Sequence, residues 1–158
     1  MKTGVQLLPC LFMVFVLGSC SKEVLPETET GGVESIVEME QEVLSLVNEY
    51  RAEKGMGALQ FSEVAYKHAS DHNDYMVSKG KLSHDNFSAR ASKISISANA
   101  QHVGENVAKD YYSAEDVLQA WVNSPNHNKT LTDTFTHTAI SVKKNTEGTL
   151  YFTQLFYR

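Results

Sequence analysis

Both cysteines of this 158-residue chain, Cys10 and Cys20, lie within its first 20 residues. An apolar run over residues 7–17 surrounds the first cysteine and follows a single lysine. The run is shorter than the about 20 residues that a membrane-spanning helix needs, so it predicts an export signal over residues 1–19. We expect Cys10 to leave with this signal. The exported domain then has no pair of cysteines for a disulfide and must be held together by packing alone.

The signal ends in Leu17-Gly18-Ser19-Cys20, which resembles a bacterial lipobox. In a lipobox, small residues allow cleavage just before a cysteine that carries diacylglycerol. We therefore expect Cys20 to anchor the chain to the bacterial cell envelope, at the outer membrane or cell surface. The alternative is an ordinary secretory signal that happens to contain a cysteine. Residues 20–35 carry several glutamates and no apolar period, which predicts a flexible acidic tether.

Composition limits the partners of the whole 158-residue chain, of which residues 36–158 are the predicted domain. Apolar residues at 42% and charged residues at 21% are typical of a globular domain, and the length suits one domain. The 14 basic and 19 acidic residues give a net charge of −5. An acidic surface repels phosphate, so we expect no nucleic-acid partner.

Three stretches repeat apolar residues at the helical spacing of three and four. They cover residues 36–54, 62–80 and about 114–122. Gly55 ends the first stretch, Ser62 is a good N-cap for the second, and Pro125 marks a turn after the third. His72 and Trp121 lie on the apolar stripes, so we expect both in the core.

Strand patterns are shorter and come later in the chain. They cover residues 103–108, 138–143 and 150–157, and residues 145–148 fit a hairpin turn between the last two. Helices that precede and interrupt an antiparallel sheet predict the α+β class, with helices covering the sheet.

Three short motifs contain candidate functional side chains. They are Leu82-Ser83-His84-Asp85, Val103-Gly104-Glu105-Asn106-Val107 and Ser124-Pro125-Asn126-His127. Each motif is weak alone, because a single histidine is more often a hydrogen-bonded structural side chain than a ligand. Neither His-x-x-x-His nor Cys-x-x-Cys occurs with the flanking residues that a zinc site needs, and the serine-hydrolase motif Gly-x-Ser-x-Gly does not occur in the sequence.

Taken in order, these motifs resemble the signature of the CAP superfamily of cysteine-rich secretory and pathogenesis-related proteins. The resemblance spans about residues 40–157, and the stretch Trp121-Val122-Asn123-Ser124-Pro125-Asn126-His127 is closest to the bacterial branch. It implies an α-β-α sandwich, in which a three- or four-stranded antiparallel sheet lies between helical layers and one side carries an open cleft. It also implies that His84 and Glu105 belong to the His/Glu tetrad of that cleft.

The tetrad is incomplete in this chain. Tyr151 occupies the position of its second histidine, and Ser124 that of its second acid. Bacterial members carry instead a histidine that matches His127. The resemblance therefore implies a cleft set of His84, Glu105 and His127, joined by Tyr151.

Two interpretations of the cleft set remain open. His84, Glu105 and His127 are two imidazoles and a carboxylate, which are suitable zinc ligands with water in a fourth position. The same three side chains can instead form a hydrogen-bonded network that orders the cleft wall, with Glu105 fixing a histidine tautomer.

Two classes of function follow from these interpretations. The protein is either a non-enzymatic binding module for a lipid or other hydrophobic ligand, a glycan or a protein, or a metal-dependent hydrolase of peptides or esters that uses His84, Glu105 and His127. We favour the binding module, because the sequence offers no activated nucleophile and no evident general acid. The sequence leaves the ligand and the oligomeric state open.

Overall fold

The computed structural model describes Met1 and residues 30–158. The predicted signal, both cysteines and most of the predicted tether lie outside the described residues. The described elements, in chain order, are α1 (Thr30–Glu53), β1 (Gln60–Phe61), α2 (Glu63–Lys79), α3 (Phe87–Ala98), β2 (Val103–Lys109), α4 (Ala114–Asn123), α5 (Pro125–Leu131), β3 (His137–Lys144) and β4 (Leu150–Tyr157).

These strands form one four-stranded sheet in the order β1-β3-β4-β2. β4 pairs antiparallel with both β2 and β3, and residues 145–148 form the expected turn between β3 and β4. The two-residue strand β1 runs parallel to β3, with Gln60 opposite His137, so the sheet is mixed at this one edge. β2 is the edge strand on the other side.

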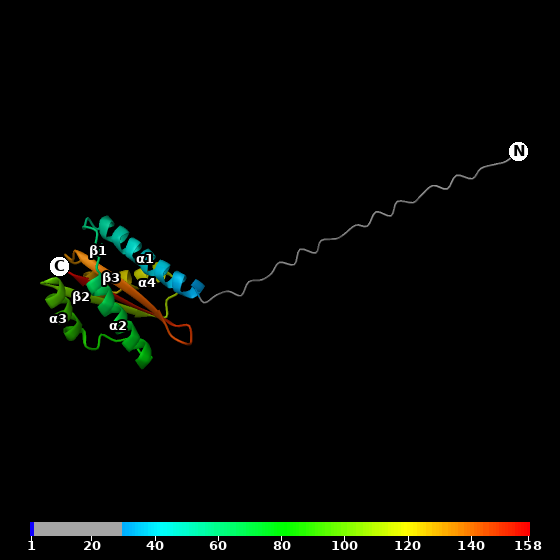
Figure 1. Ribbon diagram of the computed structural model, residues 1–158. Helices are drawn as coiled ribbons and strands as arrows, with labels where there is room; N and C mark the ends of the chain where they lie inside the picture. Colours follow the sequence, from blue (N-terminus) through cyan, green and yellow to red (C-terminus); the bar gives the residue numbers. More distant parts are fainter. Residues whose placement is uncertain (2–29) are drawn as a thin grey trace.

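Helices cover both faces of the sheet, as Figure 1 shows. α1 and α4 lie on one face, where Val43, Val117 and Trp121 pack against Phe152 and Phe156 of β4. On the other face, α2 and α3 bury a second apolar cluster that includes Leu155. The α+β class and the α-β-α sandwich are confirmed.

Local signals set the helix ends as the sequence predicts. The side-chain oxygen of Ser62 accepts the backbone N–H of Ala65 at the start of α2, and Gly80 ends that helix at a φ of 62°. His72 and Trp121 are 2% and 1% exposed, so their assignment to the core is confirmed.

Three features of the helices differ from expectation. α1 begins at Thr30, six residues before Ile36. Once Ile36 and Met39 pack on the core, further turns add one hydrogen bond per residue without a new nucleation step. α3 was not predicted, because its Ser-rich sequence buries only Arg90 and Ile94. α5 begins with Pro125, where a turn was expected, because proline also suits the first helical position.

Candidate functional site

His84 and His127 meet at the edge strand β2, with ring centroids 6.4 Å apart. They approach this edge from the two faces of the sheet: His84 from the loop between α2 and α3, and His127 from α5. Glu105 lies on β2 itself. The structure therefore places the His84 ring beside both Glu105 and His127, although His127 is not among the residues that line the cleft at this edge.

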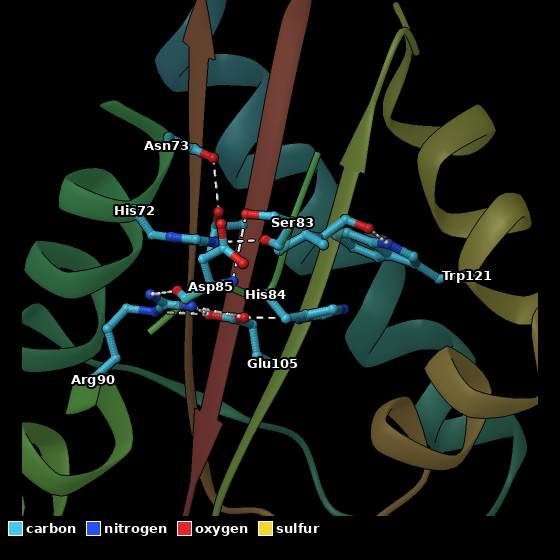
Figure 2. Close-up of polar contacts among 10 residues, drawn as sticks. His72, Asn73, Ser83, His84, Asp85, Arg90, Glu105 and Trp121 are labelled. Atoms are coloured by element: carbon cyan, nitrogen blue, oxygen red, sulfur yellow. Dashed lines mark hydrogen bonds and ion pairs between the residues drawn. The ribbon is translucent and has the colours of Figure 1, made fainter. Parts of the chain in front are cut away.

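Glu105 is bound on two sides, by Arg90 and by His84 (Figure 2). Arg90 donates from Nε to Oε2 and from a terminal nitrogen to Oε1, both at 2.9 Å. His84 Nδ1 lies 2.8 Å from Oε1. The Glu105 side chain is only 2% exposed, so this carboxylate is a buried acceptor with its partners supplied by the protein.

The contact with Glu105 fixes the role of the His84 ring. Because a carboxylate can only accept, Nδ1 of His84 carries the proton. In neutral His84 the other ring nitrogen, Nε2, is then an acceptor. The His84 side chain is 51% exposed and lines the cleft, so the ring is available to a ligand there.

Side chains of α2 hold the loop that carries His84. The Nε2 atom of His72 lies 2.8 Å from the backbone oxygen of Ser83 and donates to it. The hydroxyl of Tyr75 donates to Asp85 Oδ2 at 2.9 Å. Burial lowers the pKa of His72, which keeps its ring neutral at pH 7. The loop is thus attached on both sides of His84.

His127 is also held in its neutral form. Partial burial, and then the neighbouring His84, lower the pKa of His127. Its backbone oxygen accepts from Nδ2 of Asn106, a buried residue of β2, at 3.2 Å. This bond ties α5 to the edge strand.

An open cleft of about 340 Å³ lies at this edge. Residues 103–105 of β2 line it together with His84 and Phe87 on the side of α3 and Lys129 and Thr130 of α5. The cleft therefore lies between the two helical layers, along the edge of β2.

Phe135 forms part of the cleft wall. Its ring stacks on His102 at 4.9 Å between centroids, and His102 Nε2 lies 3.1 Å from Asp133 Oδ2. A hydrogen bond from the backbone N–H of Thr134, followed by the contact with His102, lowers the pKa of Asp133. A Cβ atom at Gly104 would lie 2.7 Å from the Phe135 ring, so this wall requires glycine on the strand.

Tyr151, the fourth predicted member of the set, is not at the cleft. Its side chain is 1% exposed and packs with Met76 and Val107 in the interior. It lies opposite Lys109, four residues along β2 from Glu105. The direction of β4 carries Tyr151 away from the end of the sheet where the cleft lies.

The described residues do not fit a zinc site. Among them, no group of three or more His, Cys, Asp and Glu side chains is placed to hold a metal ion. Both oxygens of Glu105 are already bonded to Arg90, and one of them also to His84. Glu105 would have to leave these partners to coordinate zinc. The arrangement favours the hydrogen-bonded network.

Sequence reasoning missed Arg90, which neutralises Glu105. Arg90 lies on α3, and its other terminal guanidinium nitrogen, which does not contact Glu105, donates to the backbone oxygen of Asp85 at 2.7 Å. No motif marks it. The one available signal was the spacing of Arg90 and Ile94, which are four residues apart and both buried on α3.

Comparison with known proteins places this chain in a family. The sequence model of the cysteine-rich secretory protein (CAP) family matches residues 44–156, so the chain belongs to this family. It is 31% identical over 117 residues to the uncharacterized protein YkwD of Bacillus subtilis, over 72% of this chain and 46% of YkwD. It is 26% identical over 123 residues to the uncharacterized membrane protein YlbC of the same organism, over 75% of this chain and 34% of YlbC. The chain thus spans less than half of either relative.

Solved bacterial structures share the fold. An outer surface protein from Borrelia burgdorferi superposes with a TM-score of 0.70 at 22% identity, over 77% of this chain and 92% of that one. An extracellular protein containing an SCP domain from Bacillus anthracis superposes with a TM-score of 0.72 at 24% identity, over 84% of this chain and 44% of that one. At these identities the likeness extends to the fold alone.

Proposed function

We propose that this protein is an exported cell-envelope domain that binds a ligand in the cleft beside His84 and does not catalyse a reaction. The observation that carries the proposal is the binding of Glu105 by Arg90 and His84. Glu105 orients His84 and is not free to act as a base or a metal ligand. What the cleft offers a ligand is an open volume of about 340 Å³ and an exposed imidazole.

The cleft also lacks an activated nucleophile among its described lining residues. Thr130 carries a hydroxyl there, but this hydroxyl donates to the backbone oxygen of Asn126 at 3.3 Å, and no base accepts its proton. A hydrolase of the serine or threonine type requires such a base beside the hydroxyl. This supports binding of a hydrophobic, glycan or protein ligand over peptide or ester hydrolysis.

The relatives support an envelope location. One structural neighbour is an outer surface protein, another is an extracellular protein, and one sequence relative is described as a membrane protein. None of the helices formed by residues 30–158 is both long and apolar enough to cross a membrane. We propose that the chain is exported by residues 1–19 and held at the envelope by a lipid on Cys20.

The binding proposal is tested by adding lipid, glycan and protein fractions of bacterial envelope to the ¹⁵N-labelled full chain. At least one fraction should shift the backbone amide signals of residues 103–105. The shift should be lost in Thr130→Trp, which fills the cleft, and kept in Thr146→Trp, which adds the same ring at the exposed turn between β3 and β4.

A parallel assay tests for enzyme activity. Peptide and ester substrates are incubated with the wild type and with His84→Ala, each with and without added zinc. We expect equal, background turnover in all four samples. Turnover that requires both zinc and His84 would overturn the proposal and make the protein a metal-dependent hydrolase.

A further inference from the structure

The hydrogen-bond pattern between β2 and β4 determines which residues of β2 face its open edge. His102 and Arg158 exchange both backbone hydrogen bonds, at 3.3 and 3.1 Å, and the Asp110 N–H donates to the Leu150 oxygen at 3.1 Å. Bonded and non-bonded pairs alternate along an antiparallel ladder. Even-numbered residues of β2 therefore bond to β4, and odd-numbered residues direct their N–H and C=O groups to the open edge.

The fold covers one part of this edge and leaves another open. Trp121 Nε1 donates to the outward-facing oxygen of Val107 at 3.2 Å, so α4 covers that part of the strand. Val103 and Glu105 instead line the cleft. Glu105 as a whole is 8% exposed and its side chain 2%, so most of its accessible surface is backbone. Unpaired strand-edge groups of this kind are templates for pairing with another chain.

The charges that line the cleft leave one cation without a partner. Glu105 is paired with Arg90, and Asp133 with His102. Lys129 on α5 has no ion-pair partner among residues 36–158, where side chains are described. A carboxylate entering the cleft would meet this lysine.

We propose that the cleft binds a short extended peptide as an added strand on β2, with a carboxylate of that peptide against Lys129. The proposal rests on the binding function proposed above and specifies its ligand class. The N–H and C=O groups of Val103 and Glu105 supply the backbone hydrogen bonds, as in other domains that bind a peptide at a sheet edge. Because Trp121 covers the edge at Val107, the added strand is limited to about three residues.

The ¹⁵N-labelled full chain is titrated with four pools of random tetrapeptides. The first pool has free carboxyl ends and no acidic residue, and the second has amidated ends and no acidic residue. The third has amidated ends and one internal Glu. The fourth has the sequences of the first with N-methylated backbone amides. The first or third pool should shift the amide signals of Val103 and Glu105 and slow their hydrogen exchange about tenfold. Which of the two binds distinguishes a terminal carboxylate from an acidic side chain.

The remaining pools and two variants are the controls. The second and fourth pools should bind about tenfold more weakly, since each loses a charge-assisted or backbone hydrogen bond. Lys129→Ala should weaken the carboxylate pools by about the same factor. Lys144→Ala, which removes the same charge at the far end of β3, should leave the affinity unchanged.

Two results would overturn the peptide proposal. One is no response of the Val103 and Glu105 amides to either carboxylate pool at millimolar concentration. The other is binding that survives both N-methylation and Lys129→Ala. If lipid or glycan fractions shift the same signals while the peptides fail, the binding function stands and only the ligand class is wrong. Turnover that depends on His84 would instead contradict the binding function itself.

Discussion

Glu105 accepts hydrogen bonds from two side chains, and the sequence indicated only one of them. His84 and Glu105 stand in motifs that resemble the CAP signature, and the structure places them 2.8 Å apart. Arg90 could not be predicted in the same way, because its partner becomes apparent only when α3 folds against β2. The sequence thus indicated that His84 and Glu105 lie at the cleft. It did not indicate that the charge of Glu105 is balanced by an ion pair with Arg90, because that pair depends on tertiary packing.

Tyr151 is a residue that the sequence indicated for the cleft and that the structure places elsewhere. Its position in the motif order suggested a cleft residue, whereas its side chain is buried with Met76 and Val107. A large phenol ring at an inward-facing strand position favours burial of that ring in the core.

His72 makes stability depend on pH. Its pKa is lowered in the folded protein, so the unfolded chain binds a proton more readily below about pH 6.5, the ordinary histidine value. The free energy of unfolding should therefore fall as pH is lowered from 7 through 6.5 toward the lowered pKa, by at most about 1.4 kcal/mol per pH unit. The variant His72→Gln keeps a donor for the Ser83 oxygen and should show a smaller fall. Urea unfolding at pH 7.0, 6.0 and 5.5 measures both proteins, and parallel pH profiles would contradict the prediction.

At the scale of elements, periodicity was sufficient where a helix has an apolar stripe and failed where it has none. α2, α4 and the three long strands were predicted with small boundary shifts. The two helices repeat apolar residues at the helical spacing, whereas the strands are buried along nearly their whole length and are recognised as short runs of strand-forming residues between turns. β1 is too short to show any period. α5 could have been predicted from the Ser124-Pro125 pair, since Pro at the first helical position needs no backbone N–H.

Trp121 joins α4 to the edge strand in two ways. Its ring is buried in the apolar cluster, and its Nε1–H donates to the Val107 oxygen. Trp121→Ala should lower the free energy of unfolding by about 3–5 kcal/mol through lost burial and the cavity left behind. Trp121→Phe keeps most of the apolar contact and should cost roughly half as much. Thermal and urea unfolding measure both variants, and an unchanged melting temperature for Trp121→Ala would show that the ring does not stabilise the core.

Arg51 joins α1 to the segment at the end of the cleft. It is 1% exposed. Its guanidinium group donates to the backbone oxygen of Gly57, just after α1, and to the backbone oxygens of Leu131, Asp133 and Phe135. Arg51→Met keeps the length of the side chain but leaves these acceptors unpaired, so it should lower the free energy of unfolding by about 3 kcal/mol. Amide exchange should quicken first in residues 131–135.

The matched control for Arg51 is Arg158→Met. Arg158 is exposed, so its replacement should change the free energy of unfolding by no more than about 0.5 kcal/mol. Equal effects of the two substitutions would show that the buried guanidinium adds no stability beyond that of a surface arginine.

At the scale of the whole molecule, we expect the lipid on Cys20 to decide where the domain resides. Each buried methylene of an acyl chain contributes about 0.8 kcal/mol, so two or more chains hold a protein stably at a membrane. The wild type should partition into the detergent phase, and Cys20→Ala should accumulate unprocessed or appear in the aqueous phase. A wild-type protein found wholly in the aqueous phase would contradict lipidation.

The length and direction of α1 have a consequence for such an anchored protein. α1 has 24 residues, which corresponds to about 36 Å at 1.5 Å per residue. Near its end, Arg51 contacts the segment beside the cleft, while its start lies at the other end of the domain, near the turn between β3 and β4 (Figure 1). With the lipid on Cys20, the cleft would lie about one helix length further along the domain than the end that leads to the anchor. A ligand in the medium or in a neighbouring envelope layer would then reach the cleft without first entering the bilayer.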